Sequence, residues 1–269
     1  MPESQFVWGA LLCRDVDLIE QITSNIDEQK CTIGVFIDLK KAFDTIDHKI
    51  LLKKLYVYGI RGAALQWLDS YLANRKQYVN VNDVDSDMLN VKCGVPQGSI
   101  LGPTLFILYI NDLYKVSKLL NFILFADDTN IFISGKNIDT LCNVLSNELQ
   151  HLDTWFKVNK LSLNVSKTNF MVFGKTSGTS SSRTVTINGT ELIEVESTKF
   201  LGVFIDNKLK WDKQIKHVQS KISKSISILF RVKDLLDTSA LLTLYNSLVL
   251  PYLTYCVEAW GKYISHKFE

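Results

Sequence analysis

The spacing of apolar residues along the chain predicts a mixture of helices and strands. Residues 15–30 are expected to form a helix, because their apolar positions recur with the helical period. The β-branched run Thr32–Ile37 predicts a buried strand. Asp47 is typical of a helix N-cap, so we expect a helix from there to about Gly59, followed by a second helix over Ala63–Leu72.

The middle of the chain is expected to pass from a hairpin through a loop into a helix. Tyr78–Val81 and Leu89–Cys93 predict a hairpin with Asp83, Asp85 and Asp87 in its polar turn. A loop rich in glycine and proline follows over Gly94–Gly102. Pro103 is then expected in the first turn of the next helix, where its missing N–H group costs nothing.

The next stretch predicts a second hairpin and a long amphipathic helix. Asn121–Ile133 reads as strand, turn and strand, with Asp127 and Asp128 at the turn. A helix is expected from about residue 139 to 158, and Asn169–Phe173 predicts the strand after it. The apolar stripe of that helix comprises Leu141, Leu145, Leu149, Leu152 and Phe156.

The last third of the chain is set off by a serine-rich stretch, Thr176–Arg183, which predicts a flexible linker. Beyond it, Asn188-Gly189 predicts the turn of a hairpin, Lys199–Asp206 predicts one strand, and two long helices are expected to close the chain. Hairpins and helices in irregular order predict an α+β fold. We expect a body over residues 1–175 and a C-terminal lobe over residues 184–269.

Composition narrows the class of protein. The chain has 269 residues, 46% hydrophobic and 22% charged, with a net charge of +2, so it is an ordinary globular chain without an overall basic field. The five cysteines are scattered and the four histidines lie apart from them, which argues against zinc and disulfides and favours an intracellular setting. The apolar run Phe6–Cys13 is too short to span a bilayer and lacks a basic flank, so no membrane association or signal peptide is expected.

Three aspartates lie where apolar strands are expected to end. Asp38 closes the strand at Thr32–Ile37, and Asp127 and Asp128 form the tip of the later hairpin. Each could be an ordinary turn or cap residue. If the strands are neighbours in one sheet, the three carboxylates meet at one edge, where a hard divalent cation such as Mg²⁺ or Mn²⁺ would relieve their repulsion. Two such ions about 4 Å apart suit an in-line displacement at phosphorus.

Six blocks carry a resemblance to a known family. FIDLKKAFD around Asp38, GVPQGSILGP at Gly94–Pro103 and FADD at Phe125–Asp128 resemble motifs A, B and C of a reverse transcriptase of a non-LTR retrotransposon, most similar to jockey-like elements. LSLNVSKTNFMVF, KFLGVFID and YNSLVLPYLTYCVEAWG resemble its motif D, primer grip and thumb. The likeness runs from about Thr32 to Gly261. It implies a right-hand polymerase, with an antiparallel palm sheet, packed helices and a helical thumb.

The resemblance implies an RNA-directed DNA polymerase that adds dNTPs to a primer 3′-OH by two-metal-ion catalysis. The implied partners are an RNA template, a DNA primer and dNTPs, in the nucleus or cytoplasm. The implied cofactor is Mg²⁺, two ions in all, with Mn²⁺ as a substitute, and no zinc. Asp38 and Asp127 match the two metal ligands of the family, and Asp128 matches the adjacent acid.

The resemblance also implies that residues of motif A contact the incoming nucleotide. The carbonyl of Leu39 would complete a metal shell, and the amides of Lys41 and Ala42 would approach the triphosphate. Phe43 matches the steric gate, whose ring occupies the place of a ribose 2′-OH and so selects deoxynucleotides. The spacing of Phe43 by itself favours simple core packing, and only the family match reverses that interpretation.

Motifs B and D supply three further residues. Gln97 and Gly98 match the pair that lines the nucleotide and template pocket, and glycine lets a backbone come close to a ligand. The alternative is a bent connector before a helix, but the loop holds more glycine and proline than a connector needs. Lys167 matches a lysine proposed to protonate the leaving pyrophosphate, with an ordinary surface lysine as the alternative.

A basic helix face near the end of the chain points to nucleic acid without the family match. From Trp211 onward, a helix is predicted with one apolar side and one basic side, and Lys221 lies at the flank of the basic side. The apolar side comprises Trp211, Ile215, Val218, Ile222, Ile226 and Leu229. Asp212 is the only acid between Lys208 and Lys233. Solvated faces usually mix both signs, so a row of one sign predicts contact with a duplex backbone. The lysines of this face are Lys213, Lys216, Lys221 and Lys224.

The chain departs from the family at its start. Only 37 residues precede Asp38, and the fingers block is degraded to QFVWGALLCRDVD, in which no arginine stands at the position that matches the family's arginine, so truncated fingers are expected. Two alternatives to a working polymerase follow. One is a catalytically inactive retrotransposon remnant that at most binds nucleic acid, and the other is an unstable fragment with uncovered apolar palm surface. Metal-dependent incorporation of dNTPs distinguishes a polymerase from both.

Overall fold

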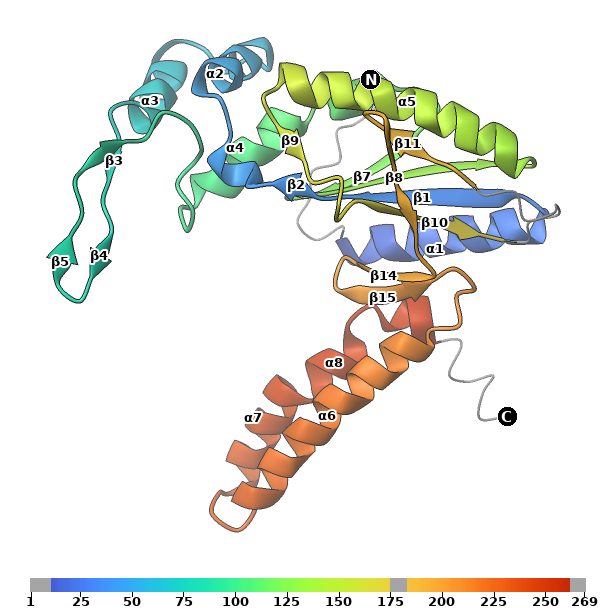
Figure 1. Ribbon diagram of the computed structural model, residues 1–269. Helices are drawn as coiled ribbons and strands as arrows, with labels where there is room; N and C mark the ends of the chain where they lie inside the picture. The colour runs from blue at the N-terminus through green and yellow to red at the C-terminus, as the bar shows by residue number, and fades with distance from the viewer. Residues whose placement is uncertain (1–10, 175–182, 262–269) are drawn as a thin grey trace. The chain divides into compact units, whose positions relative to one another are not determined.

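The computed structural model describes residues 11–174 and 183–261, and these form two compact units (Figure 1). The sheet unit contains residues 33–170 and 183–194, and the helical unit contains residues 11–32, 171–174 and 195–261. Of the predicted linker Thr176–Arg183, residues 176–182 lie outside the described residues.

A five-stranded sheet in the order β13-β10-β1-β8-β7 organises the fold. Its strands are β13 (Ile193–Glu194), β10 (Asn169–Phe173), β1 (Cys31–Ile37), β8 (Asp128–Gly135) and β7 (Asn121–Phe125). The strands predicted for β1, β7, β8 and β10 are confirmed, and so is the α+β class. The palm sheet was expected to be antiparallel, and β7 and β8 pair in that way, whereas the edge strand β13 runs parallel to β10.

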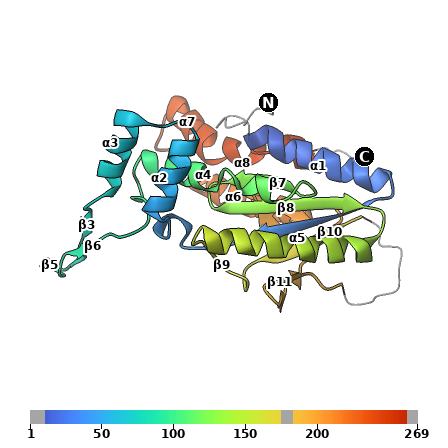
Figure 2. The same cartoon turned by 90° about the horizontal axis from the view of Figure 1, so that it is seen from above.

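Helix α5 (Ile138–Val158) covers one face of this sheet (Figure 2). Asn137 caps it by accepting a hydrogen bond from the Thr140 N–H group at 3.0 Å. All five residues of its predicted apolar stripe are buried. Inside the sheet, the rings of Phe36 and Phe132 meet edge to face at 6.0 Å, so β1 and β8 are joined by side-chain packing as well as by hydrogen bonds.

Short elements connect the strands of the sheet unit. They are β2 (Leu39–Lys40), η1 (Ala42–Asp44), α2 (His48–Val57), α3 (Gly62–Leu72), α4 (Leu101–Ile110), η2 (Leu113–Val116), β9 (Ser162–Leu163), β11 (Thr186–Ile187) and β12 (Thr190–Glu191). The predicted helices α2, α3 and α4 are confirmed, as is the Asn188-Gly189 hairpin turn between β11 and β12. Both turn residues have positive φ, 50° and 72°, which Asn-Gly tolerates well.

The hairpin predicted after α3 is present with different boundaries. It is a two-step hairpin in which β3 (Lys76–Gln77) pairs with β6 (Leu89–Asn90) and β4 (Asn80–Val81) pairs with β5 (Val84–Asp85). Asp85 was expected in the turn but belongs to a strand. The turn is confined to Asn82 and Asp83, whose φ values of 50° and 62° reverse the chain within two residues.

A half-buried lysine connects helices of the sheet unit. Lys54 Nζ of α2 donates to the Tyr109 carbonyl of α4 at 2.6 Å and pairs with Asp112 at 2.6 Å. Its ammonium also lies 4.6 Å from the Trp155 ring centre of α5. Burial lowers the pKa of Lys54, and the Asp112 carboxylate opposes that shift. One cation therefore contacts residues of α4 and α5 from its position on α2.

The helical unit contains α1 (Leu11–Asp27), predicted from about residue 15, and a second hairpin. Lys199–Asp206 was predicted as part of one strand, but it forms most of β14 (Ser197–Phe200) and β15 (Val203–Asp206), an antiparallel pair. The chain reverses because Leu201 and Gly202 have φ values of 43° and 90°. Tyr255 fixes this turn by donating to the Leu201 carbonyl at 2.7 Å.

The chain closes with α6 (Asp212–Val232), α7 (Thr238–Leu248) and α8 (Leu250–Thr254). Two long helices were predicted, but only α6 is long, because the second is interrupted at Val249, two residues before Pro251. The apolar side of α6 also differs from the prediction. Ile226 is 43% exposed, whereas Gln214 and Ser225 are buried with Trp211 and Val218.

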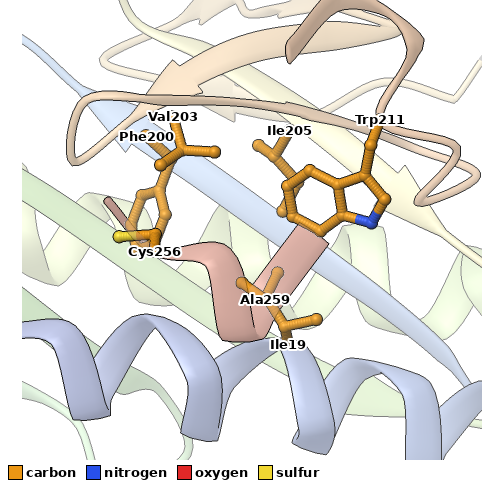
Figure 3. Close-up of a pocket in the computed structure, with 7 residues that line it drawn as sticks. All are labelled: Ile19, Phe200, Val203, Ile205, Trp211, Cys256 and Ala259. Atoms are coloured by element: carbon orange, nitrogen blue, oxygen red, sulfur yellow. The ribbon is translucent and has the colours of Figure 1, made fainter. Parts of the chain in front are cut away.

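A small apolar pocket marks the core of the helical unit (Figure 3). Side chains from α1, the β14–β15 hairpin, the start of α6 and the segment after α8 surround it. They are Ile19, Phe200, Val203, Ile205, Trp211, Cys256 and Ala259. Among the helices that the structure describes, none is sufficiently long and apolar to cross a membrane.

The Asp47 cap generates a prediction about stability. Asp47 accepts from the Ile50 N–H group at 3.0 Å and pairs with Lys160 Nζ at 2.5 Å. Asp47→Ala should lower the free energy of unfolding by about 1 kcal/mol in urea titrations, the usual cost of losing a cap. Asp47→Asn, which keeps a capping oxygen but loses the ion pair, should cost less.

The same pair fixes the direction of a pH effect. The hydrogen bond from Lys160 holds the pKa of Asp47 below its usual value. A carboxylate with a lowered folded-state pKa stabilises the fold above its unfolded-state pKa and loses that contribution as the pH falls through the folded value. The destabilisation by Asp47→Ala should therefore be full at neutral pH and shrink in strong acid. An equal effect at both pH values would contradict this account.

Candidate active site

The acidic residues lie at the ends of two neighbouring strands. β1 and β8 are adjacent in the sheet, and β1 ends at the end of the sheet where β8 begins (Figure 1). Asp38 directly follows β1, Asp127 directly precedes β8, and Asp128 is the first residue of β8. Asp38 is half-buried, while Asp127 and Asp128 are exposed. The three carboxylates therefore lie where the end of β1 meets the start of β8, and we call Asp38, Asp127 and Asp128 together the acidic edge.

A turn from distant sequence holds Asp38 in place. Asn164 Nδ2 donates to Asp38 Oδ2 at 2.7 Å, and the Asn164 N–H group donates to the Asp38 carbonyl at 2.8 Å. On the other side, the Asp38 N–H group donates to Thr168 Oγ1 at 3.3 Å, and that hydroxyl donates to the Asn164 carbonyl at 3.0 Å. Asp38 Oδ1 accepts no hydrogen bond from the described residues. One carboxylate oxygen is thus fixed and the other is available to a ligand.

The tip of the β7–β8 hairpin is strained. Phe125 pairs with Asp128, so only Ala126 and Asp127 make the turn. Ala126 has φ 49°, a left-handed conformation that costs a residue with a Cβ atom roughly 1–2 kcal/mol. The Asp127 carboxylate forms no hydrogen bond or ion pair with the described residues. Such strain is characteristic of a backbone that holds a side chain in a required position.

The donors at this edge suit a hard divalent cation. Carboxylate oxygens are the preferred protein ligands of Mg²⁺, which commonly takes one or two carboxylates and fills its shell with phosphate oxygens and water. Within residues 11–174 and 183–261, no three Asp, Glu, His or Cys side chains are grouped to hold a metal ion. Asp38, Asp127 and Asp128 thus share one end of two neighbouring strands but are not grouped as a three-ligand metal site.

The segment after Asp38 places the remaining motif A residues beside this edge. Leu39 is buried in β2 and pairs with Leu163 of β9. Lys41 is exposed and left-handed, with φ 48°, and the buried Ala42 begins η1. Phe43 is half-buried, with its ring 4.7 Å from that of the fully buried Phe106 on α4. The core packing considered for Phe43 is thus present on one side of its ring.

The glycine-rich loop docks onto this same segment. Gly94 donates to the Ile46 carbonyl at 2.8 Å, and its own carbonyl lies 2.7 Å from His48 Nε2. A Cβ atom at Gly94 would stand 2.8 Å from the Asp44 carbonyl oxygen, so only glycine fits. Gln97 Nε2 donates to Asp44 Oδ1 at 2.8 Å. Motifs A and B are therefore joined by direct contacts.

The other predicted residues are placed as follows. Gly98 is exposed, with φ 77° and open space around it. Lys167 is exposed on the Asn164–Thr168 turn that holds Asp38. The lysines of α6 lie in the helical unit, all exposed, and Lys213 donates to Ser197 of β14. These α6 lysines are Lys213, Lys216, Lys221 and Lys224.

Several residues at the site escaped sequence analysis. Asn164 and Thr168 hold Asp38, and His48 receives the Gly94 loop, yet none was singled out. In β8, directly after Asp128, Thr129 Oγ1 and Asn130 Nδ2 are buried, and neither atom has a hydrogen-bond partner among the described residues. Polar residues inside an apolar strand are a sequence signal that could have drawn attention to Thr129 and Asn130.

Comparison with known proteins defines the class to which this fold and site belong. Residues 5–205 match the family model described as reverse transcriptase (RNA-dependent DNA polymerase). The match covers most of the chain and includes all three acids, so the chain belongs to the reverse transcriptase family. The resemblance predicted from the sequence motifs is confirmed at this level.

The relatives come from non-LTR mobile elements. A protein of Drosophila melanogaster described as a probable RNA-directed DNA polymerase from transposon X-element is 28% identical over 97% of this chain and 29% of its own length. The RNA-directed DNA polymerase from mobile element jockey of the same organism is 25% identical over 88% of this chain and 26% of its own length. The chain thus spans less than a third of the length of these relatives.

A solved structure supports the fold. Telomerase from Candida albicans, determined in complex with a TWJ fragment of telomeric RNA, aligns with a TM-score of 0.51 and 14% identity. The alignment covers 98% of this chain and 50% of the telomerase chain. At this identity the likeness shows a shared fold and nothing about shared ligands.

The docking of the glycine-rich loop generates a prediction with an internal control. Gly94 and Gly98 both have positive φ, 86° and 77°, but only Gly94 faces backbone atoms within 3.0 Å. Both alanine variants should bear the cost of a left-handed residue, about 1 kcal/mol. Gly94→Ala should lower the urea midpoint clearly more than Gly98→Ala, because it must also push the loop off Asp44. Equal midpoints would show that the loop is not held against this segment.

Proposed function

We propose that this chain carries the polymerase site of an RNA-directed DNA polymerase, which adds dNTPs to a primer 3′-OH on an RNA template. The position of Asp38 and Asp127 at the meeting ends of β1 and β8 is the observation that carries this proposal. The family match over residues 5–205 supports it. The action would take place in the nucleus or cytoplasm, where dNTPs and RNA are found.

In this proposal the acidic edge receives the triphosphate and two Mg²⁺ ions, or Mn²⁺ in their place. Asp38, through its free Oδ1, and Asp127 would be the ligands, with Asp128 beside them and the Leu39 carbonyl completing the shell. When bound, the ions supply Lewis-acid stabilisation of charge on the phosphoryl oxygens. The Asn164–Thr168 turn fixes Asp38 beforehand, so that little reorganisation is needed on binding.

The motif A segment would then hold and select the nucleotide. The amides of Lys41 and Ala42 would approach the triphosphate, and the Phe43 ring would lie against the sugar. The contact with Phe106 supports the role of Phe43 as a steric gate, because a ring anchored on one side is a rigid wall on the other. A ribose 2′-OH would collide with that wall, whereas a deoxyribose would fit.

Motif B and the helical unit would position the nucleic acid. Gln97 and Gly98 would line the pocket for nucleotide and template, and the Gln97–Asp44 hydrogen bond links this pocket to the segment that holds Phe43. Lys167 would donate a proton to the departing pyrophosphate from the turn that holds Asp38. The exposed α6 lysines would contact the phosphates of the template–primer duplex. They are Lys213, Lys216, Lys221 and Lys224.

Primer extension on an RNA template tests the proposal. The chain should incorporate dNTPs only with Mg²⁺ or Mn²⁺, and Asp127→Ala should lower the rate by at least ~1,000-fold, because electrostatic stabilisation is the largest contribution to such reactions. Asp83→Ala serves as a matched control, since Asp83 is an exposed turn acid of the β4–β5 hairpin.

Full activity of Asp127→Ala would refute the assignment of the acidic edge. RNA binding by the wild-type chain without any metal-dependent incorporation would refute the catalytic proposal and support the non-catalytic RNA-binding remnant. The circular dichroism spectrum of each variant establishes that it is folded before the rates are compared.

A further inference from the structure

Helix α3 and the segment after it carry a stack of aromatic and cationic side chains, in which Trp67 and Arg75 are exposed and Tyr71 is half-buried. Trp67 and Tyr71 are four residues apart, and their rings lie nearly parallel, 5.7 Å between centres with an interplanar angle of 15°. The Arg75 guanidinium lies over the Tyr71 ring at 5.5 Å. These three residues, the α3 ladder, form consecutive layers, with Trp67 and Tyr71 on the helix and Arg75 in the segment that follows its end at Leu72.

The outer end of the α3 ladder is open. Trp67 is 58% exposed, unlike most tryptophans, which bury their large apolar rings. Tyr71 covers one face of its ring, and among the described residues no other ring or cation lies against it. The buried residue of α3 is Leu72, so the exposed Trp67 ring is not part of the buried face of the helix. An aromatic surface of this kind is a preformed place for one more flat ring.

The charged residues around the α3 ladder are almost all positive. Between His48 and Asn82 there are six lysine or arginine residues and a single acid, Asp69, although the whole chain has a net charge of only +2. Lys54 is used in the partly buried pair with Asp112, but the others are exposed and can contact anions. They are Lys49, Lys53, Arg61, Arg75 and Lys76.

A second aromatic–cation pair lies at the junction of α2 and α3. The Arg61 guanidinium stands 4.7 Å from the Tyr56 ring centre, and Tyr56 is exposed. Aromatic rings and guanidinium groups alternating along one surface bind unpaired bases by stacking and the linking phosphates by charge. Duplex nucleic acid hides its base faces, so an open ring favours a single strand.

We propose that the α3 ladder is a stacking platform for single-stranded RNA, with a base on the free face of Trp67 and phosphates at Arg61, Arg75 and Lys76. This rests on the proposed function only for the identity of the strand, which would be the unpaired part of the template. Stacking reads no base edges, so binding should tolerate any sequence.

Fluorescence anisotropy with the full chain and a labelled oligouridylate, in EDTA and without dNTPs, measures this binding. Trp67→Ala should weaken it about tenfold, the equivalent of one stacked base, and Trp67→Phe should retain most of it. Arg75→Ala should reduce the salt slope by about 0.7, the value for one phosphate contact on a single strand. Tyr114→Ala is the matched control, because Tyr114 is 49% exposed with Lys115 over its ring, and it should bind as wild type.

A second readout uses the exposure of Trp67. It is the one exposed tryptophan in the part of the chain that the structure describes, so stacked bases should quench its fluorescence, and Trp67→Phe should lose that quenching. Wild-type affinity and unchanged quenching in the Trp67 variants would overturn the proposal. So would a Trp67→Ala variant that binds RNA normally but no longer self-associates in sedimentation, because the ladder would then be a protein contact.

The polymerase proposal and this one can fail separately. Asp127→Ala should bind the oligouridylate as wild type, since it lies in the acidic edge and not on α3. If the wild-type chain incorporates no dNTPs but the Trp67→Ala change weakens RNA binding, the polymerase proposal is refuted and the stacking proposal is retained. If the wild-type chain incorporates dNTPs and Trp67→Ala binds RNA as tightly as wild type, the stacking proposal is refuted and the polymerase proposal is retained.

Discussion

The pairing of β1 with β8 is the constraint on which the site depends. Because the two strands are neighbours and β1 ends where β8 begins, residues 90 positions apart in sequence, Asp38 and Asp128, come to one edge of the sheet. The side-chain period of a strand is two, so a register slip of one residue would turn the strand-end side chains to the opposite face. The buried Phe36–Phe132 contact and the α5 stripe resist such a slip, since both require the present register.

The acidic edge is destabilised by charge repulsion and backbone strain, and contacts with neighbouring segments offset part of this destabilisation. Like charges at one edge repel one another, and the turn between them is strained at Ala126. The Asn164–Thr168 turn compensates in part, with four hydrogen bonds that hold Asp38 and the turn itself. The glycine-rich loop is held against the next segment through Gly94. A site whose parts are fixed before a ligand arrives spends less binding energy on ordering them.

Sequence patterns predicted the elements better than their connections. Asp47, Gly59 and the stripe of α5 gave correct helices because capping and periodicity are local. The β14–β15 hairpin was missed because Leu201, an ordinary apolar residue, adopts a positive φ that Tyr255 stabilises from 54 residues away. Asn164 was missed for a similar reason, since its partner Asp38 is 126 residues away. Family motifs pointed to Asp38 and Asp127, but their neighbours' contacts depend on tertiary pairing that no local pattern contains.

Iron-mediated backbone cleavage tests most directly whether the two strand ends share a cation. Fe²⁺ replaces Mg²⁺ at such sites, and with ascorbate and peroxide it cuts the chain next to the bound ion. The account predicts cuts near both Asp38 and Asp127, enhanced by a dNTP, with both sets abolished by the single variant Asp38→Asn. Cleavage restricted to one of the two segments, or cuts near Asp127 that persist unchanged in Asp38→Asn, would contradict it.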